Sequence, residues 1–103
     1  MKRIQVITTT DKEKVAARIA EALVRERLAA CVQAWPITST FPWRGKLTVG
    51  KEWILLIKAR SPDYKRIEKE IARMHNYELP EIIALPILKG SRAYLDWMDE
   101  ATK

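Results

Sequence analysis

Two kinds of hydrophobic periodicity alternate along this chain, and their order constrains the fold more than any other feature. Four segments rich in β-branched and other apolar residues are typical of strands: 4–8, 28–35, 52–58 and 81–88. Between them, apolar residues recur three and four positions apart, which predicts a helix over 11–27 and a second from Ser61-Pro62 to about His75. The order β-α-β-β-α-β predicts an α+β, ferredoxin-like antiparallel sheet, and Tyr94, Leu95, Trp97 and Met98 predict an extra C-terminal helix.

Local signals indicate where these elements begin and turn. Thr10 and Glu13 have the spacing of a capping box at the start of the first helix. Pro36 interrupts the second strand segment and Pro86 lies inside the fourth, so we expect edges, bends or bulges at both. The stretch 41–46 is predicted to be the tip of a hairpin.

The strand segments lack the alternation expected of a sheet that has one face in water. Residues 54–57 and 82–85 are continuous apolar runs, so both faces should be covered. Three helices are too few for this, and another copy of the chain is the simplest cover. The alternative is that the C-terminal helix closes the second face alone. Aromatic residues on the hairpin favour an interface between copies, since aromatics are enriched there: Trp35, Phe41, Trp43 and Trp53.

Composition excludes several classes of protein. The 103 residues suit one domain, residues 1–103. Lys and Arg number 19 and Asp and Glu 13, for a net charge of +6, but the charges are interspersed, so no nucleic-acid partner is expected. No apolar run reaches the roughly 18 residues of a membrane span, and the N-terminus is too polar for a signal peptide. One cysteine gives no internal disulfide, so we expect a cytoplasmic protein without a membrane partner.

Candidate chemical groups are few. Cys31 lies in an apolar run, which favours a buried structural thiol over a nucleophile. The three glycines are scattered, so no phosphate-binding loop is present and no catalysis is expected. His75, Glu78 and Glu81 combine an imidazole with carboxylates, a set that suits copper, zinc or nickel. A histidine that faces the dipole at a helix C-terminus is the competing interpretation.

Five stretches also carry a recognisable pattern: Leu28-Ala29-Ala30-Cys31-Val32, Trp43-Arg44-Gly45-Lys46, Glu52 with Lys58, His75-Asn76-Tyr77-Glu78-Leu79-Pro80-Glu81-Ile82, and Tyr94-Leu95-Asp96-Trp97. In this order they resemble the signature of the CutA family of divalent-cation tolerance proteins. The resemblance implies a PII-like homotrimer built by intersubunit strand pairing, and a response to divalent metals, copper above all, without catalysis or a required cofactor. It implies metal binding at His75 and Glu81. Structural or interface roles are expected for Cys31, Trp35, Trp43, Gly45, Trp53, Tyr77 and Pro80.

This chain departs from the family pattern at Thr8, where some members have a thiol, so a soft copper ligand is missing. Two other functions share the element order. An RNA-binding module would need exposed aromatics on its central strands, and residues 4–8 have none. An acyl-phosphatase-type enzyme would need a phosphate-cradling loop with an arginine after the first strand, where Thr8-Thr9-Thr10-Asp11 offers only hydroxyls and a carboxylate.

Overall fold

The computed structural model describes residues 2–103 and confirms the α+β class. The helices and strands, in chain order, are β1 (Arg3–Thr10), α1 (Glu13–Arg25), β2 (Cys31–Trp43), β3 (Lys46–Arg60), the 3-10 turn η1 (Ser61–Asp63), α2 (Tyr64–Met74), β4 (Ile82–Ile87) and α3 (Arg92–Ala101). The four strands form one antiparallel sheet in the order β2-β3-β1-β4. This is the predicted ferredoxin-like arrangement.

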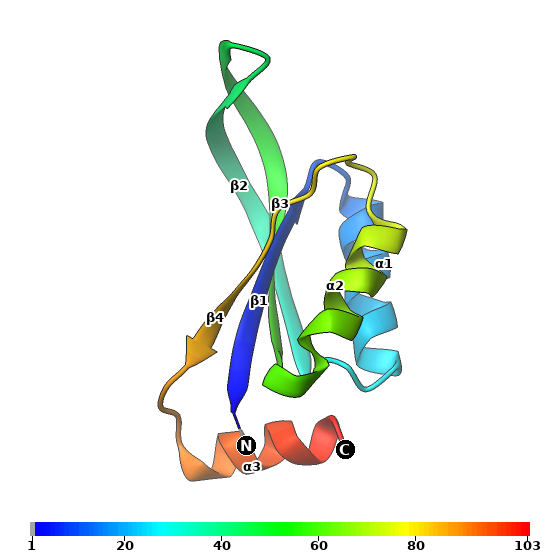
Figure 1. Ribbon diagram of the computed structural model, residues 1–103, viewed down its shortest axis with the longest axis vertical. Coiled ribbons are helices and arrows are strands. Elements are labelled where there is room, and N and C mark those ends of the chain that lie inside the picture. The colour runs from blue at the N-terminus through cyan, green and yellow to red at the C-terminus, as the bar shows by residue number, and fades with distance from the viewer. Residues whose placement is uncertain (1) are drawn as a thin grey trace.

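The hydrophobic core lies between the sheet and the pair α1 and α2, which cover one of its faces (Figure 1). Side chains alternate along a strand, so Leu55, Ile57 and Ala59 of β3 point to the helices and are buried. Val6 of β1 lies opposite Ile57 and is also buried. Each helix contributes an apolar stripe at helical spacing to this core: Val15, Ala16, Ile19 and Leu23 from α1, and Ile67 and Ile71 from α2.

The hairpin of β2 and β3 extends well beyond the rest of the sheet (Figure 1). β1 ends at Thr10, opposite Trp53, so the part of β3 that precedes Trp53 pairs only with β2. We call residues 38–51, which make up most of this projecting part, the arm. Its two-residue turn uses Arg44 with φ 52° and Gly45 with φ 77°, the left-handed geometry that matches strand twist in tight hairpins. The predicted hairpin tip is confirmed, while the strands are longer than predicted.

Pro36 and Pro42 of β2 and Pro86 of β4 all lie on edge strands, as predicted for Pro36 and Pro86. The expected interruption at Pro36 is wrong, however, because β2 runs through it as a continuous strand. Pro36 pairs with Trp53, and Pro86 of β4 pairs with Ile4. An edge strand pairs with a neighbour on one side only, so every second residue points its N–H away from the sheet. A proline at such a position costs no hydrogen bond between the strands.

Three predicted element starts are wrong. α1 begins at Glu13, and its N-cap Lys12 receives no side-chain cap within the described chain, so the capping box does not form. The Thr10 hydroxyl instead accepts a hydrogen bond from the Lys12 N–H, at 3.2 Å. The second strand begins at Cys31, since residues 28–30 form a buried connection. Ser61 opens a 3-10 turn and does not cap α2.

The second face of the sheet is only partly covered, by α3 across one end (Figure 1). Trp35 is 45% exposed, Ile83 47% and Leu85 49%. Closure of this face by the C-terminal helix alone is therefore wrong. We call the uncovered side the open face. Burial of Cys31 is also wrong for the single chain: its thiol is half-buried and contacts the Tyr94 phenol of α3.

Candidate functional site

The chain's one histidine lies where α2 ends, beside the end of β1. His75 has extended backbone and is the residue at which α2 ends. The ring nitrogen Nδ1 accepts a hydrogen bond from the Tyr77 N–H at 3.0 Å. A nitrogen that accepts cannot carry the proton of a neutral imidazole, so Nε2 carries it. Nε2 donates to the Thr9 carbonyl at 2.7 Å. Both ring nitrogens are thus bonded to main chain.

The next residue ties the same loop to β1 a second time. Asn76 accepts a hydrogen bond from the Thr10 hydroxyl through Oδ1 at 2.6 Å. Its Nδ2 donates to the Asp11 carboxylate at 2.8 Å. Thr10 is fully buried, so the bond to Asn76 gives a partner to a hydroxyl that water cannot reach.

Tyr77 completes the attachment by reaching β3. Its phenol donates to the Glu52 carboxylate at 2.7 Å and also bonds with the Asp11 backbone N–H. Burial raises the pKa of the Tyr77 phenol well above its usual value, and the hydrogen bond to the negative Glu52 raises it further. We call His75-Asn76-Tyr77 and these bonds to β1 and β3 the clamp. It holds the start of the loop to β4 against the sheet.

An open groove of about 820 Å³ lies between the arm and this loop. Three carboxylates line it, from Glu52, Glu78 and Glu81. Its other lining residues are hydroxyl, aromatic and apolar residues with one cation: Thr9, Ser39, Thr40, Phe41, Pro42, Trp43, Arg44, Thr48, Tyr77 and Leu79. The Arg44 guanidinium lies 5.7 Å from the centre of the Trp43 ring. The wall is therefore acidic and aromatic although the chain as a whole is basic.

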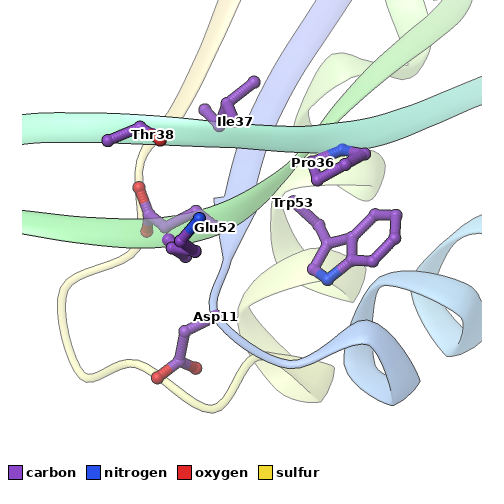
Figure 2. Close-up of a pocket in the computed structure, with 7 residues that line it drawn as sticks. Asp11, Pro36, Ile37, Thr38, Glu52 and Trp53 are labelled. Carbon is purple, nitrogen blue, oxygen red and sulfur yellow. The ribbon is translucent and has the colours of Figure 1, made fainter.

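A second, smaller pocket of about 480 Å³ lies beside it and shares Glu52. Figure 2 shows the Pro36 ring and the Trp53 indole on one side of this pocket and Asp11 below them. The Asp11 carboxylate points away from that of Glu52, so the two do not converge on one point (Figure 2). This pocket offers no cluster of ligands for a cation.

The predicted site residues fall in separate places. Glu81 lines the groove, whereas His75 is not among the residues that line it. Trp43 and Tyr77 line the groove, Trp35 lies on the open face, and Trp53 packs against the core on the helix side. Gly45 forms the arm's turn, and Pro80 lies in the loop before β4.

Sequence reasoning missed the partners of the clamp. Thr9, Thr10 and Asp11 bond to residues 65 and 66 positions further along the chain. No local pattern signals such a contact. Only the prediction that β1 and α2 end at the same edge of the sheet could have suggested it.

The site has part of what a metal centre needs. A metal-bound histidine usually donates its second ring N–H to a carbonyl or carboxylate, as Nε2–H of His75 does to Thr9. Among residues 2–103, however, no group of three or more His, Cys, Asp or Glu side chains is placed to hold a metal ion. The donor set therefore fits a weak site with one or two protein ligands and not a closed structural one.

Comparison with known proteins places this α+β fold in a class of divalent-cation tolerance proteins. The family model described as CutA1 divalent ion tolerance protein matches residues 4–101, and this chain belongs to that family. The divalent-cation tolerance protein CutA of Thermus thermophilus is 44% identical over 98 residues, 94% of this chain and 95% of that protein. Mouse protein CutA is 41% identical over 92% of this chain and 54% of its own length.

Solved structures agree with the fold throughout. The structure described as the periplasmic divalent cation tolerance protein CutA from Archaeoglobus fulgidus superposes with a TM-score of 0.95 at 37% identity, covering 98% of this chain and 99% of that one. CutA1 from rice gives a TM-score of 0.96 at 35% identity, covering 100% and 95%. No helix among residues 2–103 is both long and apolar enough to cross a membrane.

Proposed function

We propose that this chain is a self-associating, non-catalytic protein that binds divalent transition metals weakly, with His75 and Glu81 as its protein ligands and copper as the principal ion. Support for cation binding begins with the family, whose relatives are named for divalent-cation tolerance. The observation that carries the proposal is the loop 75–81, which has the chain's one imidazole at its start and a groove-lining carboxylate at its end. Imidazole with carboxylate is a donor set for copper and zinc.

Calorimetric titration tests this function directly. Copper and zinc should bind at neutral pH, and His75→Ala and Glu81→Gln should each weaken binding about tenfold or more. Glu68→Gln on α2, which is not among the residues that line the groove, is the matched control and should leave binding unchanged. Equal affinity in native chain, His75→Ala and Glu81→Gln would reject these two ligands.

The self-association proposed is a homotrimer. The open face supports it, because it carries three large apolar side chains that are about half exposed, Trp35 on the edge strand β2 and Ile83 and Leu85 on the opposite edge strand β4. β3 contributes Ile54 and Leu56 to the same side, since their neighbours Leu55 and Ile57 face the helices. Association of several copies would remove this apolar sheet face from water.

Light scattering after gel filtration tests the trimer. The native chain should elute with about three times the 12.0 kDa mass of one subunit. Trp35→Glu on the open face should shift it towards the monomer. Val24→Glu, on α1 and similarly exposed, is the matched control and should remain trimeric. A native monomer at micromolar concentration would reject the proposal.

Two further parts of the proposal have their own tests. We expect no turnover of acyl phosphates, because no arginine follows β1 directly.

We expect a cytoplasmic protein, although relatives are named for the chloroplast and for the periplasm. Cell fractionation decides this, and recovery from a membrane-bounded compartment would contradict it.

A further inference from the structure

The groove between the arm and the loop before β4 is much larger than a single metal ion requires. Its volume of about 820 Å³ is in the range of pockets that hold organic ligands. It lies at the end of the sheet away from α3, so the C-terminal helix does not cover it (Figure 1). The groove is also long. Trp43 lies at the turn of the arm, and Glu52 pairs with Ile37, six positions back along β2. At about 3.3 Å per residue, these two levels of the arm are about 20 Å apart.

Three carboxylates line the groove, and only one of them has a partner. Glu52 accepts the Tyr77 phenol through Oε2 at 2.7 Å. Glu78 and Glu81 are exposed, and neither forms a hydrogen bond or an ion pair with another residue of the range 2–103. Arg44 is the one cation among the lining residues, so the groove is negative on a chain whose net charge is +6. It therefore attracts positively charged ligands.

These carboxylates do not converge on one point. Within the described part of the chain, no three His, Cys, Asp or Glu side chains are grouped closely enough to hold a metal ion. A compact divalent ion would therefore meet only part of the negative charge. A ligand with several positive charges spaced along its length would place one ammonium group at each separated carboxylate, with a charge-assisted hydrogen bond to it.

Aromatic rings form the wall of the groove along the arm. Phe41 and Trp43 are two positions apart on β2, so their side chains lie on the same face of the strand. The Trp43 ring is half exposed and already contacts an organic cation, since the Arg44 guanidinium lies 5.7 Å from its centre. A wall of this kind accepts positively charged nitrogen groups through cation–π contacts and packs against the methylene groups that join them.

We propose that this groove binds a linear aliphatic polyamine, whose ammonium groups pair with Glu52, Glu78 and Glu81 and whose methylene segments pack against Phe41 and Trp43. Such a ligand matches the groove because its positive charges are separated by apolar segments. The site does not use the histidine, and it has only Glu81 in common with the proposed metal ligands. Failure of the metal proposal would leave it standing.

Calorimetric titration of the full chain with spermine, in metal-free buffer of low ionic strength, tests the proposal. Spermine has four ammonium groups and should bind with a dissociation constant below about 1 mM. Putrescine has two and should bind about fivefold more weakly, because it forms fewer ion pairs. The absence of spermine binding at this concentration, or equal affinity for the two amines, would overturn the proposal.

Two competitors separate a polyamine site from other causes of binding. Magnesium chloride should displace spermine no more than sodium chloride of the same ionic strength does, because a compact ion does not span the separated carboxylates. Greater displacement by magnesium would show a site for a point charge and overturn the proposal. Trilysine should bind more weakly than spermine. Tighter binding of trilysine would assign the groove to a basic peptide and would also overturn it.

Variants on both walls locate the site. Glu78→Gln and Trp43→Leu should each weaken spermine binding about threefold, the factor expected for one exposed ion pair or one cation–π contact. Glu100→Gln and Trp97→Leu, both on α3 and outside the groove lining, are the matched controls and should bind spermine as the native chain does. Unchanged affinity in the two groove variants, or equal losses in the controls, would overturn the proposal.

Discussion

Arg3 and Asp99, which are 96 positions apart, form a two-pronged ion pair between the first strand and the last helix. The Arg3 Nε lies 3.0 Å from Oδ1 of Asp99, and its Nη2 lies 2.6 Å from Oδ2. Both side chains are partly buried. The pair fastens α3 to the end of the sheet, so the two ends of the chain are held together.

This ion pair predicts a loss of stability in acid. The hydrogen bonds from Arg3 lower the pKa of the Asp99 carboxyl. A carboxyl with a lowered pKa in the folded state stabilises the fold above its unfolded value of about 3.9, and the stabilisation is lost as the pH falls through the folded value. Asp99→Asn should therefore lower the urea midpoint at pH 7, and its difference from the midpoint of the native chain should shrink as the pH falls below about 3.9.

A control substitution tests whether the loss of stability is specific to the Arg3–Asp99 pair or follows from the loss of any carboxylate on α3. Asp96 lies on the same helix, is more exposed, and is 3.8 Å from Arg92. Asp96→Asn should change the urea midpoint little at any pH, because exposed ion pairs contribute little. Equal effects of the two substitutions would contradict the assigned role of Asp99. Midpoints are compared at equal subunit concentration, since association stabilises the fold.

The clamp predicts a loss of stability in alkali. The pKa of Tyr77 is raised by burial and by Glu52, so its phenol stabilises the fold below its unfolded value of about 10. This stabilisation is lost as the pH rises, because ionisation removes the proton that bonds to Glu52. Tyr77→Phe should be less stable than the native chain at pH 7, and the gap should narrow above about pH 10. Glu52→Gln should also be less stable than the native chain at pH 7, and this difference in stability should narrow over the same pH range. A constant gap would contradict this.

Thr8, where this chain departs from the family pattern, is a position at which a substitution should increase stability. The Thr8 side chain is fully buried, and its hydroxyl has no hydrogen-bond partner within residues 2–103. A buried hydroxyl without a partner costs free energy that valine, of nearly the same shape, does not. Thr8→Val should raise the free energy of unfolding by about 1 kcal/mol in urea titration.

Thr10, two positions along the same strand, provides the matched comparison. It is equally buried, but its hydroxyl bonds to Asn76 and to the Lys12 N–H. Thr10→Val should lower the free energy of unfolding by about 1 to 2 kcal/mol, because it leaves both partners unsatisfied. Opposite signs for the two substitutions are expected. The same sign at both positions would contradict the hydrogen-bond assignments.

The turn of the arm predicts a glycine requirement at one position. Gly45 has φ 77°, where a β-carbon costs about 1 to 2 kcal/mol although no atom lies within 4 Å of it. Gly45→Ala should lower the free energy of unfolding by about that amount. Gly50→Ala is the control: its β-carbon would meet only Phe41, at 4.0 Å, and should cost nothing. Equal stability of the two variants would reject the strained turn.

The sequence by itself determined the order of the elements and the sides on which they are buried. Apolar spacing in α1 and α2 and the runs in β3 and β4 are local properties, and they predicted the fold. Pro36 and Pro86 indicated edge strands because a missing N–H has the same consequence in any sheet. The family motifs also lie in the sequence and predicted membership.

Only the tertiary structure decided what those elements bring together. The hydrogen bonds of the His75 ring nitrogens to Thr9 and Tyr77 had no signal in the sequence. Cys31 was predicted to be buried but is half-buried in the single chain, where its thiol contacts the Tyr94 phenol of α3. Bonds between residues some 65 positions apart depend on where strands and helices end in space. Periodicity along the chain specifies which face a residue occupies, but not which distant residue it meets there.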